Sequence, residues 1–81
     1  MDSKKFAIIT GASSGLGFEL ALQLAAQGFI VGALARREQE LKNLCEKITK
    51  KGGLAFYAVC DITNIEETKK AIDLLMHKAQ V

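Results

Sequence analysis

Three glycines that follow a short apolar run constrain the fold of this 81-residue chain more than any other feature. The apolar run Phe6–Ile9 comes first, and a segment of helical periodicity begins near Leu16. Between them lie Gly11, Gly15 and Gly17. A strand, a tight glycine turn and a helix N-terminus together form an anion site, because loop N–H groups and the positive end of the helix dipole face the same point. The order here is G-x-x-x-G-x-G, not the G-x-G-x-x-G of the general dinucleotide-binding loop.

Each glycine of this loop has an expected role. Gly11 turns the chain off the strand, Gly15 leaves room for the backbone to approach a pyrophosphate, and Gly17 lets the helix pack close to the sheet. Ser13 and Ser14 add hydroxyl groups, which either contact a phosphate or ribose oxygen or satisfy the loop backbone. Because the loop follows a strand and opens a helix, we interpret it as a pyrophosphate site. The alternative is a tight connection that needs glycine for its geometry alone.

Apolar runs and helical stripes alternate along the whole chain. Buried strands are predicted at 6–9, 29–35 and 54–60, and helices at 16–27, 38–51 and 65–79. This β-α-β-α-β-α order is typical of a parallel sheet with helices on its faces. We therefore predict an α/β fold, a Rossmann-like three-layer sandwich with three parallel strands. Residues 1–81 would form the N-terminal half of an NAD(P)-binding Rossmann domain, incomplete relative to a full doubly wound domain.

Two local patterns refine the predicted helices. In the first helix Leu16, Leu20 and Leu24 form an i, i+4 row, with small alanines beside it that allow close packing on a sheet. Before the last helix, the stretch from Thr63 to Glu66 has the S/T-x-x-E form of a capping box. We expect this box to begin the helix.

The open edge of the predicted sheet has a consequence for partners. In the usual strand order 3-2-1-4 the first strand is central. Without a fourth strand, the run Phe6–Ile9 is an apolar edge that invites pairing with another chain. We expect this edge to meet the remainder of a longer polypeptide, or otherwise to mediate self-association.

The residues that follow the second and third strands indicate which dinucleotide binds. Arg36 lies about 20 residues after Gly17, where an acid would bind a ribose 2′-OH and an arginine suits a 2′-phosphate. Arg37 follows it, and guanidinium groups offer paired donors to phosphate. We therefore expect NADP rather than NAD; the alternative is two solvated charges at a helix start. Asp61 and Ile62 either contact the adenine, or Asp61 is an acid that interacts with a helix dipole.

Composition argues against several classes of partner. The net charge of +2 comes without a dense basic stripe, so we expect neither nucleic acid nor an anionic membrane as partner. No apolar run approaches the roughly 18 residues of a membrane-spanning helix. Cys45 and Cys60 form no C-x-x-C array, which favours two buried thiols in a reducing cytoplasm.

Three stretches together resemble the N-terminal portion of the short-chain dehydrogenase/reductase family: Thr10-Gly11-Ala12-Ser13-Ser14-Gly15-Leu16-Gly17, Ala35-Arg36-Arg37 and Cys60-Asp61-Ile62-Thr63. The resemblance implies the cofactor portion of an NADP-dependent oxidoreductase, which transfers a hydride between nicotinamide and a carbonyl/alcohol pair. It places Arg36 on the 2′-phosphate and Asp61 with Ile62 on the adenine. Contacts with phosphates and ribose would come from Gly11, Ser13, Gly15, Leu16 and Gly17.

The family's catalytic residues have no counterpart in these 81 residues. That family uses a serine and a Tyr-x-x-x-Lys pair, whereas Tyr57 is the sole tyrosine and Asp61 stands four positions later. Tyr57 is interpreted as a packing residue of a strand, and His77 as an exposed helix residue. We expect no catalytic residue and no metal site here. A non-catalytic nucleotide-binding or assembly module, an inactive truncated fragment, is the alternative function.

Overall fold

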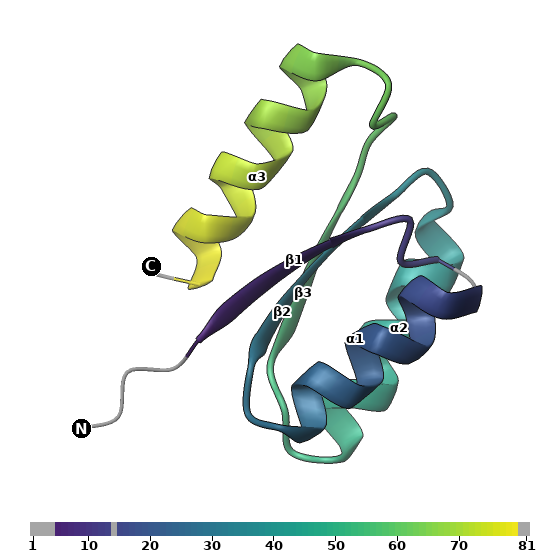
Figure 1. Cartoon of the computed structure of the whole chain (residues 1–81), viewed down its shortest axis with the longest axis vertical. Coiled ribbons are helices and arrows are strands. Elements are labelled where there is room, and N and C mark those ends of the chain that lie inside the picture. The colour runs from purple at the N-terminus through teal and green to yellow at the C-terminus, as the bar shows by residue number, and fades with distance from the viewer. Residues whose placement is uncertain (1–4, 14, 80–81) are drawn as a thin grey trace.

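Three strands and three helices alternate along the chain (Figure 1). The computed structural model describes residues 5–13 and 15–79. Every predicted boundary lies within one residue of the observed one, because each apolar run and each helical stripe ends at a polar residue or a glycine. The elements are β1 (Phe6–Thr10), α1 (Gly15–Ala26), β2 (Ile30–Ala35), α2 (Glu38–Lys50), β3 (Ala55–Val59) and α3 (Ile65–Ala79).

The three strands form one parallel sheet in the order β1-β2-β3. In the register of the sheet, Phe6 of β1 pairs with Ile30 of β2, and Val31 of β2 pairs with Ala55 of β3. The central strand β2 is buried along nearly its whole length. The strand β1 lies at one edge, as predicted, and β3 lies at the other.

The helices cover both faces of the sheet and give the predicted three layers. Figure 1 shows α1 and α2 together on one side and α3 alone on the other. The core under α1 and α2 takes alternate β2 side chains such as Val31 and packs them against Leu44 of α2. The core under α3 takes Leu34 and packs it against Leu75. Because side chains alternate along β2, one strand supplies both cores.

Of the leucine row of α1, Leu24 packs against the core under α1 and α2, whereas the other two leucines do not. Leu16 is 88% exposed and Leu20 is 49% exposed, whereas Ala21 is fully buried. The reason is steric: the helix begins so close to the loop before it that Gly17 and Ala21 occupy the inner face. Leu16 and Leu20 are therefore turned outward. Of the two cysteines, Cys60 is buried as predicted and Cys45 is only half-buried.

Candidate functional site

The loop between β1 and α1 is held at the carboxyl ends of the strands. Gly11 and Gly15 have φ angles of +68° and +60°, a region that side chains with a Cβ rarely adopt. Between them Ala12 is fully buried, and its N–H donates to the carbonyl oxygen of Leu34 in β2 at 3.3 Å. This bond fixes the loop to the central strand. The predicted sharp turn at Gly11 is confirmed.

Gly17 has a different close contact from the one predicted. A Cβ added at Gly17 would lie 2.5 Å from the carbonyl oxygen of Gly11. The glycine therefore lets the first turn of α1 approach the loop itself, rather than the body of the sheet. The first turn of α1 carries no acidic side chain. Its N–H groups, which have no partners within the helix, are accordingly not opposed by a carboxylate of that turn.

Two arginines follow β2 directly. Arg36 and Arg37 are both exposed, and Arg37 occupies the N-cap of α2 without forming a side-chain cap hydrogen bond. Just beyond the strand ends, the N–H of Cys60 donates to the carbonyl oxygen of Ala35 at 2.9 Å. This bond extends the pairing of β2 with β3, and it places Arg36 beside the segment that follows β3.

Asp61, which follows β3, is oriented by hydrogen bonds at both of its ends. Its Oδ1 accepts the N–H of Thr63 at 3.0 Å and the hydroxyl of Thr63 at 2.7 Å. Its own N–H donates to Oε1 of Glu67 at 2.6 Å. The Thr63 hydrogen bonds lower the pKa of Asp61, and the nearby Arg36 charge lowers it further. Asp61 is therefore an ionised acceptor at neutral pH.

The predicted capping box is shifted by one residue. Asn64, not Thr63, caps α3: its Oδ1 accepts the N–H of Glu67 at 3.0 Å. The physical reason is competition, because the Thr63 hydroxyl is already bound to Asp61. Glu67 takes the place expected of Glu66, and its carboxylate reaches back to Asp61.

The loop after β1 and the residues that follow β2 and β3 line one cavity of about 460 Å³, a volume within the range of small-molecule sites. Six of the predicted site residues line it: Gly11, Ser13, Arg36, Arg37, Asp61 and Ile62. Gly15, Leu16 and Gly17 lie at the start of α1 and are not among its lining residues. Ser14 lies outside the described residues. The cavity also includes Ala35, Cys60 and Thr63, which the predicted site did not contain; the D-x-T spacing of Asp61 and Thr63 was the available signal for the last of these.

The donor set of this cavity suits a nucleotide that carries phosphate groups. Two guanidinium groups and a glycine loop at a helix N-terminus favour anions. The single carboxylate, Asp61, is an acceptor for hydroxyl or amino groups. Ile62, which is 47% exposed, offers an apolar surface to a flat ring. Added Cβ atoms at Gly11 and Gly15 would meet no atom within 4 Å, so the space over the loop is open.

Two further observations concern the same described residues. Across 5–13 and 15–79, no helix combines the length and apolar character needed to cross a membrane. Within those ranges, no three His, Cys, Asp or Glu side chains gather into a group that could hold a metal ion. His77 is exposed on α3, as predicted.

Comparison with known proteins points to one family. The family model for short-chain dehydrogenases matches residues 5–80. An uncharacterized oxidoreductase of Listeria monocytogenes is 39% identical over 74 residues, which are 91% of this chain and 30% of that protein. The chain therefore spans less than a third of the length of this relative.

Solved structures of the same family share the fold. A metagenomic short-chain oxidoreductase in complex with NADP has a TM-score of 0.84 and 27% identity, over 91% of this chain and 34% of that one. A short-chain dehydrogenase/reductase from Burkholderia phymatum in complex with NAD has a TM-score of 0.86 over 91% of this chain and 26% of that one. At 24% identity, the second shows the fold alone.

Proposed function

The chain belongs to the short-chain dehydrogenase family, and we propose that it is the portion of an NADP-dependent oxidoreductase that binds the adenosine half of the cofactor. The observation that carries the proposal is the convergence of the glycine loop, the arginine pair and Asp61 on one cavity. In the complete protein, the nicotinamide of the bound cofactor would exchange a hydride with a carbonyl/alcohol pair. The residues of this chain would bind and orient that cofactor.

Each lining group has a proposed partner on the dinucleotide. The loop from Gly11 to Gly17, with Ser13, holds the pyrophosphate and the adjacent ribose. Asp61 accepts a hydrogen bond from the adenine, and Ile62 packs on its ring. The lowered pKa of Asp61 supports this role, because only the ionised carboxylate offers acceptors on both oxygens.

The preference for NADP over NAD rests on Arg36 and Arg37. Both arginines line the cavity just after the second strand, where the ribose 2′ substituent is expected. The two residues that follow β2 carry no carboxylate that could accept a hydrogen bond from a 2′-OH. The third, Glu38, is hydrogen-bonded to Tyr57. The NADP complex of one related structure agrees with this preference. The fold itself does not decide between the two cofactors, since a similar structure holds NAD.

Two adenosine phosphates test the proposal on this part of the site alone. Adenosine 2′,5′-bisphosphate has the 2′-phosphate of NADP, and 5′-AMP lacks it. We expect the bisphosphate to displace NADPH from the natural-length protein at least about tenfold more effectively, as one charge-assisted hydrogen bond of ~1.5–3 kcal/mol requires. Equal displacement by both would refute the NADP assignment, and displacement by neither would refute the binding site.

We also propose that the remainder of the longer polypeptide covers the open edge of β1. The outer side of this edge strand is unpaired within the described residues, and Leu16 and Leu20 of α1 are exposed. In the natural-length protein, amide hydrogens of β1 should be protected from exchange at a protein concentration where the protein is not self-associated. An isolated 81-residue chain should instead self-associate in sedimentation. A monomeric chain with a cooperative thermal transition would contradict this.

A further inference from the structure

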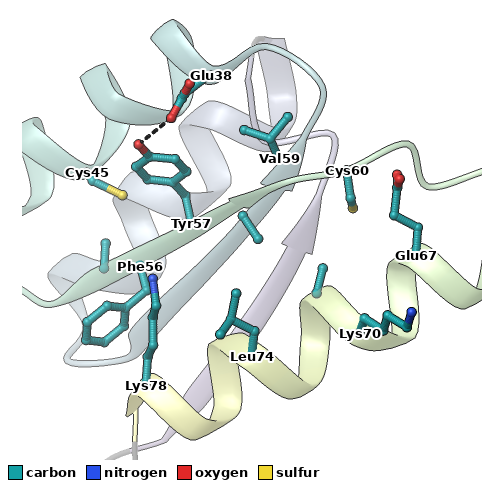
Figure 2. Close-up of a pocket in the computed structure, with 13 residues that line it drawn as sticks. Glu38, Cys45, Phe56, Tyr57, Val59, Cys60, Glu67, Lys70, Leu74 and Lys78 are labelled. Atoms are coloured by element: carbon teal, nitrogen blue, oxygen red, sulfur yellow. Dashed lines mark hydrogen bonds between the residues drawn. The ribbon is translucent and has the colours of Figure 1, made fainter.

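A second cavity, larger than the proposed nucleotide site, is a groove along the outer edge of β3 (Figure 2). It has a volume of about 650 Å³ and runs between α2 and α3. Its floor is the whole of β3, and its walls come from one helix on each face of the sheet. Two half-exposed apolar side chains, Val59 and Leu74, line it.

The backbone along this groove has hydrogen-bonding groups with no strand to pair with. The N–H of Val31 donates to the carbonyl of Leu54, and the N–H of Cys60 donates to the carbonyl of Ala35. In a parallel ladder, alternate residues face the same neighbour. The backbone hydrogen-bonding groups that face β2 therefore belong to Leu54, Phe56, Ala58 and Cys60. The N–H and carbonyl groups of Ala55, Tyr57 and Val59 face outward into the groove.

The α2 wall of the groove is fixed by one hydrogen bond. The hydroxyl of Tyr57 donates to Oε2 of Glu38 at 3.0 Å (Figure 2). Tyr57 packs against the core under α2, as its interpretation as a packing residue predicted, and its hydroxyl adds this bond at the rim. This wall is acidic and already hydrogen-bonded.

The α3 wall carries two lysines, Lys70 and Lys78, and one acidic residue, Glu67, whose carboxylate accepts the N–H of Asp61. Lys70, Leu74 and Lys78 are spaced four residues apart, so they form one row along the helix, and all three line the groove (Figure 2). The row spans eight residues of helix, or about 12 Å. An extended strand covers a similar length, about 13 Å, in four residues. Its side chains at i, i+2 and i+4 point to one face.

We propose that this groove binds an extended peptide segment, which adds as a fourth strand beside β3. The segment would have an acidic residue at i, an apolar residue at i+2 and an acidic residue at i+4. Its carboxylates would meet Lys70 and Lys78, and its apolar side chain would contact Leu74. Its main chain would pair with the outward groups of Ala55, Tyr57 and Val59.

The same charges disfavour a second copy of this chain as the occupant. Two β3 strands paired antiparallel about a two-fold axis would bring α3 beside its own copy. Leu74 would then meet Leu74, but Lys70 of each chain would approach Lys78 of the other. Like charges placed directly opposite destabilise such a pairing. An acidic strand replaces this repulsion with attraction.

Two blocked heptapeptides test the proposal on the natural-length protein. The first, TETVTET, has the predicted spacing, and the second, TKTVTKT, reverses its charges. We expect the glutamate peptide to bind more tightly by about 2- to 30-fold, the range that two surface ion pairs give. The double variant K70E/K78E should reverse this preference. The matched variant K42E/K69E, which changes two exposed lysines outside the groove by the same total charge, should keep it.

Peptides with N-methylated amides test the strand geometry. Methylation of the amides that face β3 should abolish binding, whereas methylation of the alternate amides should leave it intact. Equal behaviour of the two methylated peptides would overturn strand addition. If neither heptapeptide binds, the proposal is overturned. A peptide-free dimer in sedimentation that K70E/K78E alters and K42E/K69E does not would also overturn it.

Discussion

Gly17→Ala is the substitution that most sharply tests how the loop is built. The added Cβ would lie 2.5 Å from the carbonyl oxygen of Gly11, and an ordinary contact begins near 3.4 Å. Because the obstacle is backbone, the loop itself must shift. Alanine improves helix propensity by about 1 kcal/mol, but overpacking of this kind costs about 1–3 kcal/mol. We expect a net loss of up to about 2 kcal/mol in the free energy of unfolding.

The same substitution should weaken nucleotide binding. A loop displaced from the phosphates loses at least one charge-assisted hydrogen bond of ~1.5–3 kcal/mol, which corresponds to about 10- to 100-fold in the dissociation constant for NADPH. Denaturant unfolding and NADPH fluorescence titration measure the two effects. Gly28→Ala is the matched control: its φ of +97° makes alanine strained, but the residue lies after α1, at the far end from the loop. It should lower stability and leave the NADPH dissociation constant unchanged. Wild-type affinity of Gly17→Ala for NADPH would refute the proposed role of the loop.

Two further predictions concern the helix caps and a titrating group. Asn64→Ala should lower the free energy of unfolding by about 1 kcal/mol in denaturant titrations, because it removes the cap of α3, whereas Glu66→Gln should change it by less than about 0.5 kcal/mol; the reverse order would place the cap on Thr63. Burial and the hydrogen bond to Glu38 raise the pKa of Tyr57 above its ordinary value of about 10. Its contribution to stability should be fully present below about pH 10 and lost as the pH rises through the raised pKa. Tyrosinate absorbance should show the Tyr57 titration moving to lower pH in Glu38→Gln, and an unchanged titration would contradict the role of this bond.

The elements and the strand order were predictable because their signals are local. Apolar runs buried on both faces mark parallel strands, and the stripe of α2 faces the sheet as its spacing requires. Helix ends at Gly28 and Gly52 coincide with positive φ angles. The residues after β2 and β3 were predictable as neighbours, since the carboxyl ends of parallel strands meet at one edge.

The features that the sequence did not predict depend on contacts between segments. Leu16 and Leu20 have helical spacing, but the close approach of Gly17 to Gly11 turns them outward. Asn64 rather than Thr63 caps α3 because Asp61 binds the threonine hydroxyl.

The groove beside β3 could not be predicted from helix periodicity alone. On periodicity alone, Lys70, Leu74 and Lys78 are interpreted as a solvated helix face. The structure adds that the edge of β3 lies beside them and that together they line a groove.

Arg36 is the proposed determinant of cofactor choice. Competitive titration of the natural-length protein with NADPH and NADH gives the ratio of their dissociation constants for wild type, Arg36→Ala and the neighbouring control Arg37→Ala. We predict that the wild type prefers NADPH and that Arg36→Ala reduces this preference by about 10- to 100-fold, with little change for NADH. Arg37→Ala should reduce it less, because Arg37 is one residue further from the strand, at the N-cap position of α2. An unchanged NADPH/NADH ratio in Arg36→Ala would contradict the account.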